Sequence, residues 1–485
     1  MNRLGLNSEE EPRVHANERD SGSVARMSSP AVIGWIGLAA VSFHAAQYWN
    51  IGWLTIPCAY ALIALCRQPS HRRATYLPMI AGFLFYAPRL GFFWGIFGPG
   101  ATALWYVLAF WVALFGLTLF LVHRRFGEIT MLVLAPVVWT GLEYFRGELY
   151  YLRFTWLSLG MAHTGTPPPI AMVGMYGLGF LSFAIAAGLQ ALSRGRPLRS
   201  FALLTFIALA GLLMKFTPRE ELAANNSGVS VAGMQLEVPS EEQIPHALDL
   251  LVEAFPDAQL LLLSEYTFDG PIPDGVRRWC REHGRYLVAG GKEPIGATDF
   301  FNTAYVVGPS GEIVHRQAKS VPIQFFKDGQ PAPERRVWDS PWGPMGILIC
   351  YDLSYTTVVD DFVRQGAKAL LAPTMDAADW GRAQHELHAR IGPMRAAEYG
   401  IPIFRVCSSG ISQLVAADGT VVTSAPFPGD GAMLGGKMSM NEKPRLPLDR
   451  MLAPLCSAIT GVVLAWLAVD AVRRRSVRRQ VRTVT

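Results

Sequence analysis

Charge is scarce in the first half of this 485-residue chain. Charged residues make up 17% of the sequence and hydrophobic residues 51%, and residues 31–216 are almost free of Asp and Glu. Soluble domains usually contain about 25% charged residues, so a protein that is soluble along its whole length is excluded. Residues 217–450 have the mixed composition of an ordinary soluble domain, which predicts a domain boundary near residue 217.

The sequence also lacks the patterns of metal centres and of nucleic-acid-binding surfaces. Its six cysteines form no Cys-x-x-Cys pair, and no His/Cys cluster has zinc spacing, so we expect no metal and no cofactor. A disulfide between Cys280 and Cys407 is left open, although nothing requires it. The net charge of +5 is mild and no aromatic-and-basic surface stands out, so no nucleic-acid partner is expected.

Eight apolar runs are predicted to form transmembrane helices. Most have the roughly 17–25 residues that a spanning helix needs. The second and seventh are near the lower limit, where a buried core helix is the alternative. Too little polar sequence lies nearby to cover such a core, so the membrane interpretation is preferred. The runs are residues 31–49, 51–66, 76–97, 101–123, 129–146, 170–192, 200–216 and 451–472.

Basic residues predict the orientation of these helices. Every even-numbered run ends in a basic cluster, whereas the turns at residues 50 and 98–100 carry none. Positive charge marks the cytoplasmic side, so both termini are predicted inside and residues 217–450 outside the cytoplasm. The clusters are Arg67, Arg72 and Arg73; His123, Arg124 and Arg125; Arg194, Arg196 and Arg199; and Arg473, Arg474, Arg475, Arg478 and Arg479.

This pattern divides the chain into five predicted parts. Residues 1–29 are polar and without apolar periodicity, which predicts a disordered cytoplasmic tail. A signal peptide is the alternative, but its charged n-region would be very long. The remaining parts are a membrane domain of helices one to seven (30–218), a soluble domain (219–448), helix eight (449–473) and a basic cytoplasmic tail (474–485).

The soluble domain alternates strand-like and helical stretches, which predicts an α/β layered fold. The predicted strands are residues 228–235, 259–263, 286–289, 303–307, 345–349, 369–372, 402–406 and 413–416, and several are continuously apolar, as in strands covered on both faces. The predicted helices are residues 244–254, 274–283, 357–365 and 384–399. Residues 167–169 and 425–436 are rich in Pro or Gly and are predicted to be loops.

Three polar residues stand at or after the ends of predicted strands. Glu265 follows the run 260–264, Cys350 follows 346–349, and Lys319 follows a turn and the short strand 312–315. Alone, each has a common structural explanation: a packed thiol, a capping or paired carboxylate, and a solvated ammonium. Together they supply a nucleophile, a base that takes its proton, and a cation that stabilises an oxyanion.

The order Glu, Lys, Cys, with the segment Ile349-Cys350-Tyr351-Asp352, resembles the carbon–nitrogen hydrolase (nitrilase) superfamily. From about residue 31 to residue 472 the chain resembles the apolipoprotein N-acyltransferase family, which places such a domain between its last two membrane helices. Residues 143–147 are similar to that family's Glu-Trp-Leu-Arg-Gly, and residues 154–156 to its Phe-Pro-Trp. Further similar segments are residues 376–381, 384–385, 389–390, 395–396, 398 and 409–412.

The resemblance implies an eight-helix membrane bundle plus a nitrilase-type α-β-β-α sandwich. It implies a monomeric enzyme of the bacterial inner membrane, with the hydrolase domain on the periplasmic side. Cys350 would take an acyl chain from a phospholipid as a thioester, with Glu265 as general base and Lys319 stabilising the tetrahedral intermediate. The acceptor would be the N-terminal amine of a diacylglyceryl-cysteine lipoprotein. The supporting or binding residues would be Tyr351, Asp352, Asp328, Trp380 and Trp156.

The segment after Lys319 departs from the family's Lys-x-x-Leu-Val-Pro-Phe-Gly-Glu. If the two sequences are aligned at residues 311–312, Lys319 corresponds to the family's catalytic lysine, and the loop that follows is two residues shorter than in the family. Aligning them at residues 321–322 would put Gln317 there and leave the enzyme inactive. We prefer the first, because loops tolerate deletions. The Glu that ends the family's segment supplies a second carboxylate to its active site, and this chain has no Glu there. Asp328 is either its substitute or an ordinary turn residue.

Other departures concern the lipid substrates. Met375 replaces the Asn that starts the family's loop, and residues 407–408 are Cys-Ser instead of Thr-Asn. Trp380 and Trp156 either contact lipid chains or are ordinary interfacial aromatics. Three hypotheses therefore stay open: a lipoprotein N-acyltransferase, a related amidase or acyltransferase with another amine acceptor, and a catalytically silent homologue. A transporter is disfavoured, because no inverted repeat is evident.

Overall fold

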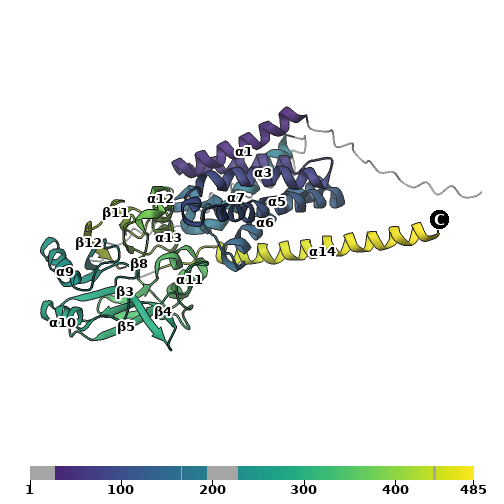
Figure 1. Ribbon diagram of the computed structural model, residues 1–485. Coiled ribbons are helices and arrows are strands. Elements are labelled where there is room, and N and C mark those ends of the chain that lie inside the picture. The colour runs from purple at the N-terminus through teal and green to yellow at the C-terminus, as the bar shows by residue number, and fades with distance from the viewer. Residues whose placement is uncertain (1–27, 165–166, 194–227, 441–443, 485) are drawn as a thin grey trace, which may run out of the picture.

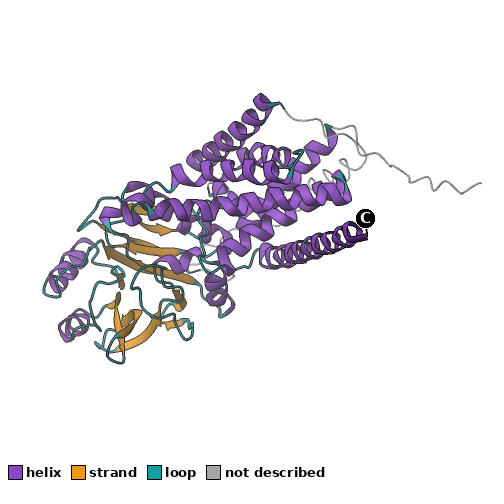
Figure 2. Ribbon diagram, turned by 45° about the vertical axis from the view of Figure 1, so that its right-hand side comes forward, coloured by secondary structure: helices purple, strands orange, loops and turns teal. Residues whose placement is uncertain are grey.

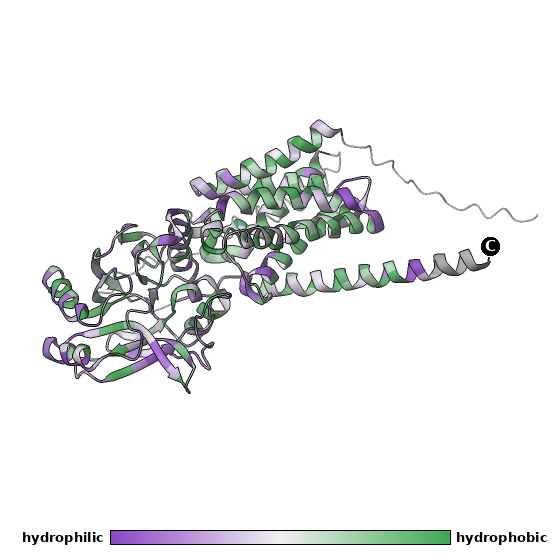
Figure 3. Ribbon diagram, viewed as in Figure 1, coloured by the Kyte–Doolittle hydropathy of each residue, from purple (hydrophilic) through white to green (hydrophobic). Residues whose placement is uncertain are grey.

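The computed structural model describes residues 28–164, 167–193, 228–440 and 444–484. A bundle of apolar helices adjoins a domain built from two sheets, and the long helix α14 (Asp449–Val484) runs beside the bundle (Figure 1). Figure 2 shows that the strands belong only to the second part, and Figure 3 shows apolar residues along the bundle helices. The strands and the bundle helices therefore occupy separate parts of the structure, and the boundary predicted near residue 217 lies outside the described residues.

Within the described ranges, five helices are long and apolar enough to cross a membrane. They correspond to the first, fourth, fifth, sixth and eighth predicted runs, and the seventh run, 200–216, lies outside the described residues. The second run contains a helix of only 11 residues, and the third is divided between two helices. The number eight therefore stays a prediction. The bundle contains α1 (Ser29–Trp49), α2 (Thr55–Leu65), α3 (His71–Arg89), α4 (Phe93–Phe97), α5 (Gly100–Phe126), α6 (Glu128–Tyr144) and α7 (Pro167–Leu192).

A bend in α7 joins the bundle to the soluble domain. Gly174 has φ 74°, and a side chain there would collide with the carboxylate of Asp449 at the start of α14. The bend frees the N–H groups of Met175 and Tyr176 from the helical ladder. They donate to Glu398 Oε1 and Asp449 Oδ2, both at 2.9 Å. Buried backbone donors need such partners, so glycine at residue 174 fixes how the two parts meet.

The soluble domain contains two six-stranded sheets. The first has the order β12-β1-β2-β3-β4-β5, in which β1, β2 and β3 are parallel. The second has the order β11-β10-β9-β8-β7-β6, in which β7, β8 and β9 are parallel. The strands are β1 (Gly228–Met234), β2 (Leu260–Leu262), β3 (Tyr286–Ile295), β4 (Asp299–Val307), β5 (Ile313–Ala318), β6 (Trp338–Ser340), β7 (Gly343–Ile347), β8 (Ala369–Thr374), β9 (Ile403–Cys407), β10 (Ser412–Val415), β11 (Val421–Ala425) and β12 (Met433–Ser439).

Side-chain alternation along the strands builds a four-layer sandwich. Leu261 and Leu263 pack in the cluster under α9 (Gln243–Ala254) and α10 (Asp274–His283), whereas Leu260 and Leu262 belong to a separate cluster. A Cβ on Gly233 of β1 would meet side chains of β9, so the two sheets approach closely there. Helices α11 (Thr356–Arg364) and α13 (Ile391–Tyr399) pack on the second sheet, and α13 also packs on α7. The predicted α-β-β-α arrangement is confirmed.

The predicted loops and one predicted helix need correction. Met433–Ser439 forms β12, which pairs with β1 along its length. Its Gly-Gly pair had led to the prediction of a loop over residues 425–436. Residue 167 begins α7, consistent with the tolerance of proline in a helix's first turn. The stretch 384–399 is two helices, α12 (Arg382–Ala389) and α13, which meet at Arg390.

Candidate active site

The three polar residues expected at strand ends come together between the sheets. Glu265 follows β2, Lys319 directly follows β5, and Cys350 opens the short helix η4 (Cys350–Ser354) after β7. Lys319 Nζ lies 2.9 Å from Glu265 Oε1. The Cys350 thiol points to Met375 O at 3.5 Å, and Met375 N–H donates to Glu265 Oε2 at 2.7 Å. All three side chains are almost completely buried.

Glu265 is held by three donors. Asn302 Nδ2 donates to its Oε1 at 2.6 Å, in addition to Lys319 and the N–H of Met375. Burial raises the pKa of the Glu265 carboxyl above its usual value, and nearby Asp328 adds to this, while Lys319 opposes it. A carboxylate with a raised pKa is a better proton acceptor than an exposed one, so the environment suits a general base.

Asp328 lies inside this cluster rather than at an ordinary exposed turn. Its Oδ2 is 2.7 Å from Lys319 Nζ and accepts from Ile323 N–H at 2.7 Å. Its Oδ1 accepts from Tyr266 OH at 2.7 Å and Asn302 Nδ2 at 2.9 Å. Burial alone would raise the pKa of Asp328, but the Lys319 ammonium lowers it below the usual value. The carboxylate therefore stays ionised beside the lysine.

The structure places Lys319, and not Gln317, against Glu265. Gln317 instead bonds to backbone groups: its Nε2 donates to Glu334 O at 3.2 Å, and its Oε1 accepts from Arg336 N–H at 3.0 Å. Burial would lower the pKa of Lys319, but Asp328 and Glu265 raise it well above its usual range. Lys319 is therefore a permanently charged ammonium between two carboxylates.

Cys350 occupies a strained turn that Asp352 supports. Its φ is 53°, a left-handed conformation that is uncommon for residues other than glycine. Asp352 accepts backbone N–H groups from Ser320 at 2.9 Å, Val321 at 2.7 Å and Ile349 at 3.2 Å, so it ties this turn to the lysine loop. Burial, together with the charge of Glu265, raises the pKa of the Cys350 thiol well above its usual range. A nucleophile at this position would therefore rest as a thiol and would need a base.

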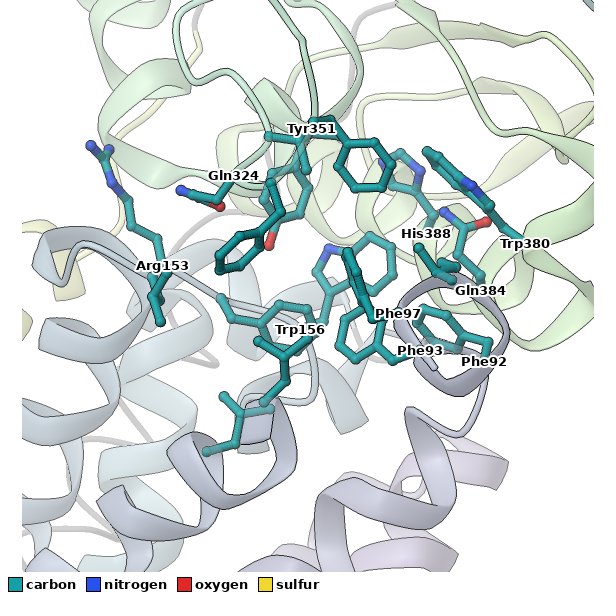
Figure 4. Close-up of a pocket in the computed structure, with 18 of the residues that line it drawn as sticks. Phe92, Phe93, Phe97, Arg153, Trp156, Gln324, Tyr351, Trp380, Gln384 and His388 are labelled. Carbon is teal, nitrogen blue, oxygen red and sulfur yellow. The ribbon is translucent and has the colours of Figure 1, made fainter. Parts of the chain in front are cut away.

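A largely aromatic cavity adjoins Cys350 and is partly open to solvent, so that its empty space of about 910 Å³ includes some of that open solvent. Figure 4 shows residues that line it. Its walls come from both parts of the chain. The bundle side contributes Phe92, Phe93, Ile96, Phe97, Leu104, Val107, Leu108, Leu152, Arg153, Phe154 and Trp156; the sandwich side contributes Ile323, Gln324, Phe325, Phe326, Tyr351, Asp376, Trp380, Gln384 and His388. Such a wall can hold long apolar chains beside the thiol.

The remaining expected residues are placed as follows. Trp156 donates from Nε1 to Ser354 Oγ at 3.1 Å, and its ring lies 5.8 Å from that of Tyr351. Trp380 lies 5.9 Å from the ring of Phe326 at the cavity wall. Tyr351, Trp380 and Trp156 therefore line the cavity, whereas Asp352 lies behind the nucleophile turn.

Several site residues were missed by sequence reasoning. Asn302 lies in β4, directly before a predicted apolar strand, and Tyr266 follows Glu265; both bond to Asp328. Arg405 interrupts the predicted apolar strand 402–406, and a buried cation there signals a buried anion, which is Asp376 at 2.6 Å. His388 also contacts Asp376. The aromatic residues of α4 carried no signal of their own.

The cysteines and the possible metal ligands of the described residues are placed as follows. All six cysteines are free and buried there, so the disulfide left open between Cys280 and Cys407 does not form. Cys280 lies on α10 and Cys407 on β9, in different layers. Among these residues no group of three or more His, Cys, Asp or Glu could hold a metal ion.

Comparisons with known proteins match both parts of the chain. Residues 37–188 match the apolipoprotein N-acyltransferase N-terminal domain, and residues 240–434 match the carbon-nitrogen hydrolase domain. An apolipoprotein N-acyltransferase of Geobacter metallireducens is 25% identical, over 91% of this chain and 95% of that protein. One from Shewanella oneidensis is 24% identical, over 85% of this chain and 90% of that protein.

Solved structures match part of the chain. A carbon-nitrogen hydrolase from Helicobacter pylori is 16% identical with a TM-score of 0.39, and the match covers 48% of this chain and 93% of that one. Nit3 of Saccharomyces cerevisiae, a member of the nitrilase superfamily, is 16% identical with a TM-score of 0.38, over 44% and 90% respectively.

Proposed function

The chain belongs to the apolipoprotein N-acyltransferase family, and from that premise we propose that it moves an acyl chain from a phospholipid, through a Cys350 thioester, to the N-terminal amine of a diacylglyceryl-cysteine lipoprotein. The observation that carries the proposal is the position of Cys350. It lies between the buried Glu265–Lys319 pair and an apolar cavity whose wall is partly made by the membrane bundle. This arrangement joins a nucleophile to a site for lipid chains.

In the first half-reaction Glu265 takes the thiol proton, and the thiolate attacks the ester carbonyl of the phospholipid. The ammonium of Lys319 stabilises the resulting oxyanion. The C–O bond then breaks, Glu265 gives its proton to the leaving alkoxide, and a lysophospholipid departs. Asp328 keeps Lys319 charged and fixed in place, in the role of a second carboxylate.

In the second half-reaction the acceptor amine attacks the thioester carbonyl. The C–S bond breaks, an amide-linked third acyl chain forms, and Cys350 returns to the thiol. Tyr351, Trp380 and Trp156 hold the acyl chains, and Asp352 holds the nucleophile turn. The protein acts in the bacterial inner membrane, and we place the sandwich domain on its periplasmic side, consistent with the basic clusters that end the even-numbered apolar runs.

The test is acyl transfer by the full-length protein in detergent, with phospholipid and a synthetic diacylglyceryl-cysteine peptide. Cys350→Ala removes the nucleophile, and Cys280→Ala is the matched control, because Cys280 is a buried thiol on α10. We expect one added acyl chain on the peptide from the native protein and the control, and none from Cys350→Ala.

Two results would redirect the proposal. A Cys350 thioester without acylated peptide would indicate an acyltransferase with a different amine acceptor. The absence of both thioester and product would refute acyl transfer, and release of ammonia from small amides would then identify an amidase.

A further inference from the structure

A second buried acid–base pair lies on the wall of the same cavity. His388 of α12 contacts Asp376 Oδ1 through Nδ1 at 2.7 Å, and both side chains are almost fully buried. Asp376 also accepts from Arg405 Nη2 at 2.6 Å and from Gln384 Nε2 at 3.0 Å. Burial would raise the pKa of Asp376, but His388 and Arg405 hold it well below its usual range. An ionised carboxylate only accepts, so the ring proton of His388 sits on Nδ1.

The other ring nitrogen, Nε2, has no hydrogen-bond partner among the residues that the structure describes. His388 lines the cavity together with Cys350, and the Trp156 ring packs against it at 5.1 Å (Figure 4). Burying an unsatisfied nitrogen is unfavourable, so it needs an explanation. A hydrogen-bond donor on a substrate would satisfy Nε2.

One short loop connects the sulfur to both bases. Met375 follows β8; its N–H binds Glu265, and its carbonyl accepts from the thiol of Cys350. The next residue is Asp376, which holds His388. Met375 therefore connects the thiol to Glu265, and the neighbouring Asp376 connects the same loop to His388.

The neutral ring can accept a proton. Burial lowers the pKa of His388, and Asp376 only partly opposes this. The other titratable groups that act on the ring are Arg405 of β9 and His385 of α12, and both favour its neutral form. Free α-amino groups have a pKa of about 7.7–8.0, so an acceptor reaches the site largely as an ammonium, which cannot attack a carbonyl.

We propose that His388, positioned by Asp376, is the base that deprotonates the acceptor's α-ammonium in the second half-reaction. The assignment rests on the proposed function and adds a residue to it. A proton passes from the ammonium to Nε2, and the free amine attacks the thioester carbon. A C–N bond forms and the C–S bond breaks, while the second nitrogen proton passes through Glu265 to the Cys350 thiolate. The imidazolium then releases its proton to water, so one ammonium and one thioester give one amide, one thiol and one proton.

The test separates the two half-reactions in single-turnover experiments on the full-length protein. His388→Asn keeps a donor for Asp376 but removes the basic nitrogen. We expect a Cys350 thioester to form within about threefold of the native rate, and transfer to the peptide at pH 7 to fall about 100-fold. Because solution then supplies the free amine, this defect should shrink as the pH rises from about 7 to about 9. The matched control is His246→Asn, on the exposed face of α9.

Three results would overturn the assignment: native transfer by His388→Asn, a defect of equal size at both pH values, or an equal loss of thioester formation in a variant with native thermal unfolding. His388→Gln is the second variant if His388→Asn does not fold, and the same split is expected. Failure of the proposed function is a separate observation, because the native protein itself would then form no thioester.

Discussion

Asp328→Asn is the sharpest test of the cluster around Lys319. The carboxylate accepts four donors: the Lys319 ammonium, Tyr266 OH, Asn302 Nδ2 and the N–H of Ile323. An amide oxygen at the Oδ1 position keeps the bonds from Tyr266 and Asn302. The amide nitrogen then faces Lys319 and Ile323, both of which are donors. The substitution therefore changes two contacts from attraction to repulsion while keeping the volume.

The magnitude follows from those two contacts. A hydrogen bond to a charged group contributes about 1.5–3 kcal/mol, and one buried neutral donor left unpaired costs about 1–3 kcal/mol. We expect the free energy of unfolding to fall by about 2–4 kcal/mol, because Lys319 keeps Glu265 as a partner. Misplacing the oxyanion-stabilising ammonium should slow thioester formation by about 10²–10³-fold.

The assay is single-turnover formation of the Cys350 thioester, followed by intact mass, with thermal unfolding measured on the same preparation. Asp339→Asn is the matched control, because Asp339 is exposed on β6. Thioester formation at the native rate by a folded Asp328→Asn would refute the reasoning. Asp328 would then be an ordinary structural residue, and the second carboxylate of the family would have no substitute here.

Further predictions concern pH, the α7 bend and the cavity. The rate of thioester formation should fall on acidification as Glu265 becomes protonated, and the midpoint should lie above the usual range of a glutamate because burial raises the pKa of its carboxyl. In Asp328→Asn the midpoint should move to lower pH, because a neighbouring negative charge is lost, and an unmoved midpoint would contradict this coupling. Gly174→Ala should lower the free energy of unfolding by about 3 kcal/mol or more, because φ is 74° and Asp449 fills the space that a side chain would need. The control Gly284→Ala, where φ is 61° and the space is open, should lower it by about 1–2 kcal/mol. Equal losses of thermal stability in the two variants would contradict this explanation. Trp380→Ala should raise several-fold the phospholipid concentration needed for half-maximal thioester formation, with little change in the maximal rate, because Trp380 lines the cavity. A fall in the maximal rate alone would argue against a role of Trp380 in binding.

Much of the sandwich was predictable because its strands are continuously apolar. The eight predicted strands all appear, with ends that agree or differ by up to six residues. The omitted strands β6, β11 and β12 lie at or near sheet edges, where one side is exposed and apolar patterning is weak. Residues 433–439 show the limit most clearly, because Gly435 is required by the close approach of Phe255, and that neighbour is visible only in the fold.

The candidate site was only partly predictable for a similar reason. Glu265, Lys319 and Cys350 follow recognisable strands, so their order in the sequence already predicts a shared crevice. Asp328 and Asn302 carried no comparable pattern, and their importance depends on distances of 2.6–2.9 Å to residues on other elements of the domain. Whether Lys319 or Gln317 lies beside Glu265 could be decided only in the structure, where Gln317 bonds to backbone groups instead.

The wall of the cavity depends on both parts of the chain. Phe93 and Phe97 of α4 lie on the bundle side, and the Phe97 ring lies 5.8 Å from that of Phe326 on the sandwich side. Neither part alone would enclose the space beside Cys350. A sandwich domain cut free of the bundle would expose more of Tyr351, Phe326 and Trp380 to water, of which only Tyr351 is buried in the full chain, at a cost that scales with the apolar area uncovered. The bundle therefore contributes about half of the residues that line this cavity.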